Sequence, residues 1–93
     1  MENKIIKLEN CAIINVNNER SLFGHVVKDH RHDPISTKFA PGHRLVTSEI
    51  QKENGNIFNT RNSIYEALNF IDIAPETLSD LKKMYGNVEI ISQ

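Results

Sequence analysis

The 93-residue chain is poor in the residues that build covalent cross-links, metal modules and membrane segments. Its single cysteine, Cys11, excludes an intramolecular disulfide framework and a cysteine-rich zinc module, and it favours a reducing, cytoplasmic setting. The apolar runs are only a few residues long, too short for a membrane span or for the apolar part of a secretory signal. We therefore expect a cytoplasmic protein without membrane contact.

Aromatic side chains and excess charge are scarce as well. Tryptophan is absent, aromatic residues make up 6% of the chain, and the formal net charge is −1. A protein that tracks nucleic acid needs a basic groove with aromatic platforms for the bases. We therefore assign the phenylalanines to the core and expect no sequence-specific nucleic-acid partner.

What the chain does contain is typical of one small globular domain. Apolar residues make up 39% and charged residues 25% of the sequence, which is inside the globular range and outside the disordered one. A chain of this length holds one core. We expect a single domain over residues 1–93.

The charges are unevenly distributed. Residues 20–47 contain five basic and two acidic residues, a net charge of +3, so the remainder carries −4. All four histidines, His25, His30, His32 and His43, lie in the same segment. A basic segment on a mildly acidic protein indicates an anionic ligand bound at one place, with a solvated loop of ordinary surface charge as the alternative.

Short β-branched and apolar runs predict an antiparallel sheet. The expected strands cover residues 4–8, 11–16, 21–27, 43–50 and 56–60, with a bulge or turn at 9–10. Residues 17–19 and 53–56 predict hairpin turns, the second of type I′, because Asn-Gly accepts positive φ. In the strand over residues 21–27, Leu22, Gly24 and Val26 share one face, and Gly24 marks a bulge or a close approach. Phe23, His25 and Val27 share the other face.

Residues 63–70 are ambiguous between a strand and a helix. Ser63 and Glu66 have the spacing of a helical capping box, yet the apolar residues also continue the sheet, and we favour the strand. Residues 88–91 predict a last short strand or a tail that pairs with a neighbour.

The helix is expected at about residues 75–84. Pro75 suits the first helical position, Leu78 and Leu81 form an apolar stripe with Met84 or Tyr85, and Gly86 ends the element. The predicted fold class is α+β: a meander-like antiparallel sheet of 4–6 short strands with one C-terminal helix.

Residues 28–42 show no periodicity and predict a long loop. Asp33-Pro34 and residues 40–42 are turn signals, and Phe39 is a candidate anchor to the core. Loops of about fifteen residues in compact domains are usually functional or disordered.

The histidines raise the question of a metal. His30 and His32 on an extended chain point to the same side, and imidazole is the commonest transition-metal ligand. The spacing of the four histidines matches no zinc signature, so no metal site is assigned, and a histidine-based metal-dependent hydrolase is kept as a second alternative.

Nucleophilic catalysis is not expected. Cys11 lies in an apolar run and is interpreted as a small buried side chain, while Ser48 or Ser63 with His43 sits on no recognisable elbow or helix N-terminus. The sequence therefore predicts a protein that is not an enzyme and needs no cofactor.

Binding of a small phosphorylated ligand is the favoured chemistry. Arg31, Arg44 and Arg61 offer planar forks suited to phosphate. Thr47-Ser48 and the segment 60–63 add hydroxyl and amide groups, and the hairpin between them predicts that they lie at related positions on adjacent strands. The alternative is that these polar residues only form turns and strands.

Several short motifs resemble a group of small bacteriophage and prophage proteins. The matching pieces are Gly24-His25-Val26, His30-Arg31, Gly42, Thr47-Ser48-Glu49-Ile50 and Thr60-Arg61-Asn62-Ser63-Ile64-Tyr65. They span about residues 10–66, and this chain departs from the pattern by a longer loop over 32–40. The resemblance implies a non-enzymatic accessory protein that inhibits host defence. Some such proteins are sponges that sequester a cyclic nucleotide or a signal similar to cyclic ADP-ribose.

Together these observations predict a phage-type anti-defence protein that sequesters an anionic nucleotide-like signal as a homo-oligomer, because a small chain has little concave surface of its own. The alternative is a protein–protein inhibitor of a host defence complex, similar to an anti-CRISPR protein, whose acidic remainder mimics DNA. The candidate ligand-binding residues are Arg31, Arg44, Arg61, Thr47, Ser48, Asn62, Ser63, His30, His43 and Tyr65.

Overall fold

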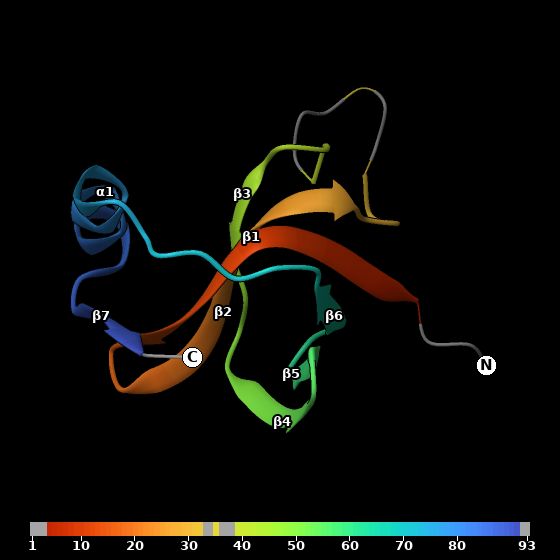
Figure 1. The fold of residues 1–93 in the computed structure, drawn as a ribbon, viewed down its shortest axis with the longest axis horizontal. Helices are drawn as coiled ribbons and strands as arrows, with labels where there is room; N and C mark the ends of the chain where they lie inside the picture. The colour runs from red at the N-terminus through yellow and green to blue at the C-terminus, as the bar shows by residue number, and fades with distance from the viewer. Residues whose placement is uncertain (1–3, 33–34, 36–38, 92–93) are drawn as a thin grey trace.

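One long strand, β1 (Ile5–Val16), pairs with three other strands in the computed structural model, which describes residues 4–32, 35 and 39–91 (Figure 1). Along one edge it pairs antiparallel with β2 (Glu19–Lys28). The first part of its other edge pairs parallel with β6 (Ile64–Ala67), and the last part pairs antiparallel with β7 (Val88–Ile91). The expected last strand is therefore confirmed.

The sheet has two antiparallel halves joined by the parallel β1–β6 pair. Its order is β3-β2-β1-β6-β5-β4, with β3 (Arg44–Val46), β4 (Ile50–Asn54) and β5 (Ile57–Thr60). The α+β class and the mainly antiparallel sheet are confirmed. The described residues form seven strands, one more than the upper limit expected. The sheet is not a simple meander, because β6 pairs with the distant β1 as well as with β5.

The segments 4–8 and 11–16 belong to one bulged strand, not two. The pairing register with β2 shifts between Glu9 and Ala12, and Asn10 adopts φ 52°. Asn69 holds the bulge: its side-chain oxygen accepts the Asn10 N–H at 2.9 Å, and its amide donates to Asn10 Oδ1 at 3.0 Å. The bulge changes which alternate residues face the inner core.

The segment 43–50, expected as one strand, is two strands in different halves of the sheet. The break lies at Thr47, where the backbone N–H still bonds to the Leu22 carbonyl but the side chain takes over the other bond of the pair. Its hydroxyl accepts the Leu22 N–H at 3.0 Å and donates to the Ser48 carbonyl at 2.8 Å. The chain then leaves β2, which pairs with β3, and begins β4, which pairs with β5.

Both expected hairpin turns are present, and the second has a different type. Asn17 and Asn18 have φ 51° and 73°, as a type I′ turn requires. In the β4–β5 hairpin Asn54 pairs with Ile57, so the central residues are Gly55 and Asn56. Only Gly55, at φ 62°, has positive φ, which fits type II′ rather than the expected I′.

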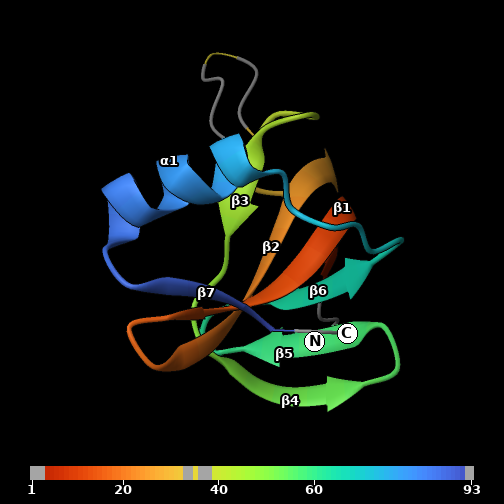
Figure 2. The same cartoon turned by 60° about the vertical axis from the view of Figure 1, so that its left-hand side comes forward.

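The helix α1 (Pro75–Tyr85) confirms the expected element within one residue. Pro75 occupies the first turn, and Gly86, at φ 95°, donates its N–H to the Lys82 carbonyl at the other end. Figure 2 shows the helix lying across one face of the sheet beside β2 and β3. No helix among the described residues is long and apolar enough to cross a membrane.

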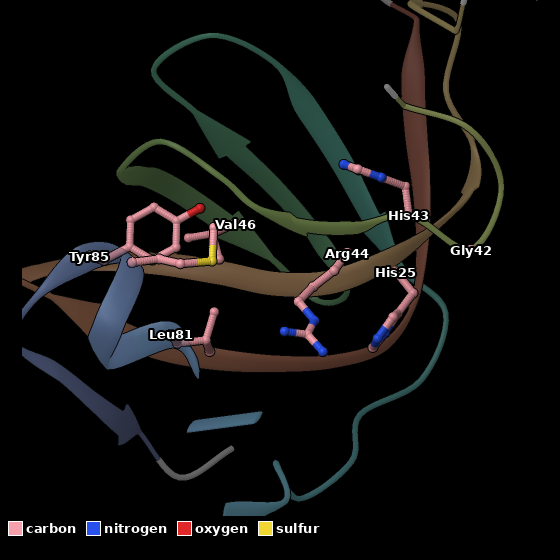
Figure 3. A pocket seen from close by; sticks show the side chains of 8 residues that line it. His25, Gly42, His43, Arg44, Val46, Leu81 and Tyr85 are labelled. Carbon is pink, nitrogen blue, oxygen red and sulfur yellow. The ribbon is translucent and has the colours of Figure 1, made fainter. Parts of the chain in front are cut away.

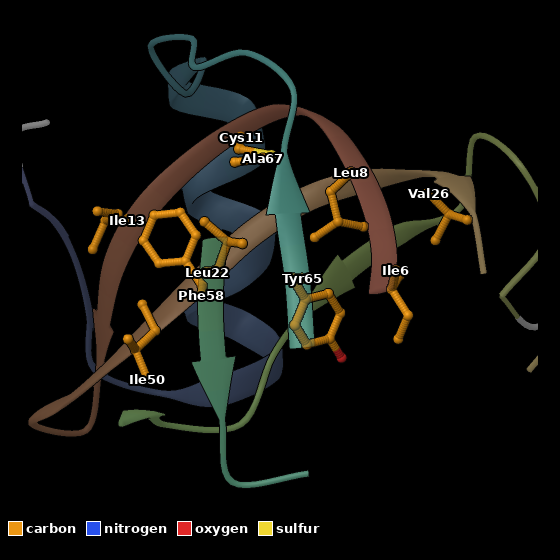
Figure 4. Close-up of a cluster of buried hydrophobic side chains, with 10 residues drawn as sticks. All are labelled: Ile6, Leu8, Cys11, Ile13, Leu22, Val26, Ile50, Phe58, Tyr65 and Ala67. Carbon is orange, nitrogen blue, oxygen red and sulfur yellow. The ribbon is translucent and has the colours of Figure 1, made fainter. Parts of the chain in front are cut away.

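Two apolar clusters lie on the two faces of the sheet. The inner cluster joins β1 and β2 to the β4–β6 half (Figure 4), and its buried members are Ile6, Leu8, Cys11, Ile13, Leu22, Val26, Ile50, Phe58, Tyr65 and Ala67. The helix-side cluster lies under α1 and contains Ala12, Ile14, Phe23, Ile73, Leu81 and Val88. Leu22 belongs to the inner cluster and Phe23 to the helix-side cluster, which confirms the alternation expected along β2.

Gly24 marks a close approach, as expected. A Cβ at this position would lie 2.9 Å from Cys11 Sγ and 3.1 Å from Leu8 Cβ. The described residues of the segment 28–42 form a loop after Lys28, as expected, while the Asp33-Pro34 turn lies outside the described residues.

Replacing Gly55 by valine tests the hairpin. We expect the free energy of unfolding to fall by about 1–3 kcal/mol, because a β-branched residue is strained at positive φ. Urea denaturation measures the change. Gln51→Val, at an exposed position inside β4, is the matched control and should leave stability nearly unchanged. Equal stability of the two variants would contradict the turn geometry.

Leu81→Asp tests how the helix packs. Leu81 is buried in the helix-side cluster, so the variant loses apolar burial that contributes about 1.5–3 kcal/mol and adds a buried carboxylate. We expect the variant to be unfolded or severely destabilised in chemical denaturation, whereas Ser79→Asp at an exposed helix position should fold normally. A native-like Leu81→Asp variant would show that α1 does not pack on this face.

Candidate functional site

A cleft of about 470 Å³ opens between the β2–β3 edge of the sheet and the C-terminal half of α1 (Figure 3). Its position follows from the packing of Leu81, which holds the helix against the sheet while the residues around it remain at the surface. The lining residues are His25, Gly42, His43, Arg44, Val46, Leu81, Met84 and Tyr85.

The sheet side of the cleft is basic. His25 on β2 and Arg44 on β3 are direct cross-strand partners, so their side chains share the face that α1 covers. His43 precedes β3, and its carbonyl accepts the Val26 N–H at 2.9 Å. Gly42 turns the chain into β3 at φ 85° and donates its N–H to the Val26 carbonyl. These backbone bonds fix the main chain that leads into β3. The His25 and Arg44 side chains point into the cleft together, whereas the His43 ring points to the other side of β3 (Figure 3).

His25 is half-buried and has one nitrogen without a partner. Its ring packs edge-on against Phe23 with centroids 5.4 Å apart, and Nδ1 is buried with no hydrogen bond. A buried N–H without an acceptor is more costly than an unused acceptor, so we place the proton of the neutral ring on Nε2. Nε2–H is then the donor that His25 can offer to a ligand.

Arg44 is held only loosely. Its Nη1 lies 3.8 Å from Asp80 Oδ2 on α1, and the two side chains are 41% and 56% exposed. Exposed pairs of this kind contribute about 0–1 kcal/mol. An anion that entered the cleft could therefore replace Asp80 as the partner of Arg44.

The helix side of the cleft is apolar. Leu81 is buried, whereas Met84 is 67% exposed and Tyr85 is 37% exposed. These residues stand at i, i+3 and i+4 and so lie on one face of the helix. The cleft thus places the Arg44 and His25 side chains opposite an apolar helix face.

Arg31 belongs to a different group of contacts, which we call the loop clasp: Asp29, Arg31, Phe39 and Tyr65. Arg31 Nη2 lies 2.7 Å from Asp29 Oδ2, and the Asp29 side chain is fully buried. The guanidinium lies 4.0 Å from the centre of the Phe39 ring and contacts the Tyr65 hydroxyl at 3.4 Å. The clasp joins the loop after β2 to β6, and Phe39 contributes to it.

The clasp is electrostatically satisfied. Burial raises the pKa of the Asp29 carboxyl, but hydrogen bonds from the Arg31 side chain and backbone lower the pKa by more, so it lies below the usual 3.8. Asp29 therefore stays ionised at neutral pH and keeps Arg31 engaged. The structure brings Arg31 and Tyr65 together, as partners of each other.

A third group of predicted residues lies where β4 and β5 meet. Ile50 pairs with Thr60, and the Arg61 N–H donates to the Glu49 carbonyl at 3.1 Å. The two hydroxyl-rich segments are thus neighbours, as the hairpin predicted. The exposed Arg61 side chain lies 3.5 Å from Glu19 and 3.4 Å from Glu49.

The Thr60 hydroxyl at this junction forms hydrogen bonds with the backbone. Thr60 Oγ1 accepts the Ser63 N–H at 3.2 Å and donates to the Ser63 carbonyl at 3.0 Å, closing the turn before β6. Ser48 Oγ is buried without a hydrogen bond, and Asn62 is exposed. His30, also exposed, stands in the loop beside the clasp.

The predicted site residues therefore fall into separate groups. His43 and Arg44 line the cleft, and Arg31 and Tyr65 form the clasp. Thr47 bonds to the Leu22 backbone of β2, whereas the segment 60–63 meets Glu49 where β4 and β5 begin and end. The sequence-based ligand set did not contain His25, Met84 or Tyr85, which also line the cleft. The sequence signal for Met84 and Tyr85 was that the apolar stripe of the helix continues beyond Leu81.

The histidines and Cys11 form no metal or thiol site among the described residues. Within residues 4–32, 35 and 39–91, no group of three or more histidine, cysteine, aspartate or glutamate side chains is arranged to hold a metal ion. Burial and nearby Glu9 raise the pKa of the Cys11 thiol to about 12, so it is protonated at neutral pH. Cys11 is a buried core residue, as expected.

Comparisons with protein-family models, with curated proteins and with solved structures find no match.

Arg31→Ala tests the clasp. We expect the free energy of unfolding at pH 7 to fall by about 1–3 kcal/mol, because the buried Asp29 carboxylate loses its partner. A carboxyl whose pKa is lowered by folding stabilises the fold above its unfolded pKa and ceases to do so as the pH falls through the folded value. The difference in the free energy of unfolding between the unmodified chain and Arg31→Ala should therefore become smaller below about pH 4. Urea denaturation at several pH values measures it.

Arg20→Ala is the matched control for this experiment. Arg20 pairs with Glu53 at 2.8 Å, but both side chains are exposed, so the change should be within about 1 kcal/mol. Equal effects of the two substitutions, or a deficit for Arg31→Ala that does not depend on pH, would contradict the role given to Asp29.

Proposed function

We propose that this chain is a non-enzymatic binding protein that holds a small anionic, nucleotide-like ligand in the cleft between β2–β3 and α1. The observation that supports the proposal is that His25 and Arg44 lie together on one side of a 470 Å³ space whose other side is apolar. A concave, partly apolar pocket with a few converging polar groups is the usual form of a small-molecule site.

The charges at the cleft favour an anion. Arginine and protonated histidine donate charge-assisted hydrogen bonds to phosphate oxygens, and a neutral histidine still donates from one nitrogen. Arg44 has only a weak, solvent-exposed partner, which a phosphate can displace. Arg31, by contrast, is engaged by a buried carboxylate, so the proposal does not use it as a ligand contact.

The size of the cleft favours a small molecule over a polymer. Its volume lies in the lower half of the range of small-molecule pockets. The formal net charge of −1 also disfavours a protein that follows a nucleic-acid backbone. The resemblance to small phage proteins extends the proposal to a cytoplasmic anti-defence role, in which a homo-oligomer sequesters a nucleotide signal. Native mass measured with and without ligand tests the oligomer.

Substitutions of Arg44 test the proposal. Thermal shift against a panel of cyclic and linear nucleotides identifies a ligand, and titration then gives its dissociation constant. Arg44→Ala should weaken binding about 10- to 150-fold, because a charge-assisted contact contributes about 1.5–3 kcal/mol. Arg44→Lys should restore only part of the loss, because lysine cannot bind in a fork. The melting temperature without ligand should hardly change.

Arg61→Ala is the matched control, because Arg61 is also exposed and also lies near carboxylates. Its affinity should equal that of the unmodified chain. If Arg61→Ala weakens binding and Arg44→Ala does not, the ligand binds at the β4–β5 junction and the cleft proposal is wrong. If no nucleotide shifts the melting temperature and the chain co-purifies with a host nuclease complex, the protein–protein inhibitor alternative replaces it.

A further inference from the structure

The two walls of the cleft define the ligand further. We propose, as an extension that rests on the proposed function, that the cleft takes a nucleoside monophosphate unit. Its phosphate binds at His25 and Arg44, and its base lies against Met84 and Tyr85 in the last turn of α1. The last turn of the helix is then the element that distinguishes a nucleotide from a bare phosphate.

The apolar wall supplies the first argument. Met84 and Tyr85 are large side chains that remain 67% and 37% exposed, although Leu81 one turn earlier is buried. Both line the same cleft, as Figure 3 shows for Tyr85 beside Val46. An aromatic ring and a thioether are favourable surfaces for a flat heteroaromatic base, because stacking needs only a π-face and sulfur contacts aromatic rings well.

The basic wall supplies the second argument. His25 and Arg44 are directly paired across β2 and β3, which places their Cβ atoms about 4.5–5.5 Å apart. Because the two side chains start side by side on one face, their donor groups can reach different oxygens of one phosphate group. His25 offers Nε2–H because its Nδ1 is buried and without a partner, and Arg44 offers its guanidinium fork.

The spacing of the walls supplies the third argument. Arg44 on β3 and Asp80 on α1 lie 3.8 Å apart, so the two walls are close enough for one ion pair to join them. Asp80 immediately precedes Leu81 in the helix. A ligand that contacts Arg44 beside Asp80 at one end and Tyr85 at the other therefore spans five helical residues, about 7.5 Å along the axis, which suits a single nucleotide unit.

The experiment compares ligands that share the phosphate and differ in the base. Isothermal titration gives dissociation constants for inorganic phosphate, ribose 5-phosphate and the four nucleoside 5′-monophosphates. We expect at least one monophosphate to bind more tightly than the two ligands without a base. Tyr85→Ala should weaken that monophosphate about 5- to 150-fold, the range for losing an aromatic stacking partner, and leave phosphate affinity unchanged.

Two further variants keep the test clear of folding effects. Tyr85→Phe retains the ring and should bind like the unmodified chain. Met84→Ala alters a side chain that is mostly exposed and should weaken only ligands that carry a base. The main-chain carbonyl of Tyr85, which accepts the Asn17 amide at 2.9 Å, is kept in all variants.

The outcomes separate the two proposals. If phosphate binds and depends on Arg44, yet no monophosphate binds more tightly, the base subsite is wrong and the anion site stands. An equal loss of phosphate and monophosphate affinity in Tyr85→Ala and Met84→Ala also overturns the subsite. If neither phosphate nor any monophosphate binds the unmodified chain, the proposed function fails together with this inference.

Discussion

The bulge in β1 is the constraint on which the rest of the structure depends. β1 has buried residues on both faces, and the register shift between Glu9 and Ala12 assigns them: Ile6, Leu8 and then Cys11 face the inner cluster, while Ala12 and Ile14 face the helix. Without the extra residue, strict alternation would turn the buried residues of the second half of β1 to the opposite faces of the sheet. The reciprocal Asn10–Asn69 hydrogen bonds hold the bulge against the segment that follows β6.

The cleft is a consequence of that arrangement. Because the second half of β1 presents Ile14 to the helix-side cluster, α1 packs there through Leu81, close to β2 and β3. The helix is too short to cover this face completely, and Met84 and Tyr85 stay exposed opposite Arg44. The proposed binding site is thus an edge of the core that packing leaves open rather than a separate loop structure.

The three arginines that look alike in the sequence have different surroundings in the fold. Arg31 is paired with the buried Asp29 and stacked near Phe39, which gives it a structural contact. Arg44 and Arg61 face exposed carboxylates at longer distances and keep most of their freedom. Burial of the partner, which is a tertiary property, decides which guanidinium is available to an anion. Only Arg44 of the three lines the cleft with other basic side chains.

Local chemistry determined much of the fold from the sequence alone. Pro75 and Gly86 bound the helix, the Asn17–Asn18 turn and the positive φ of Gly55 follow from residues that accept left-handed backbone, and alternation placed Phe23 and His25 on one face of β2. These features depend on neighbours within a few residues. The split between β3 and β4 and the parallel pairing of β6 with β1 depended instead on contacts between distant segments, such as Thr47 with the Leu22 backbone. The meeting of His25 and Arg44 with Tyr85 had the same origin, because no local pattern encodes which face of a sheet a helix covers.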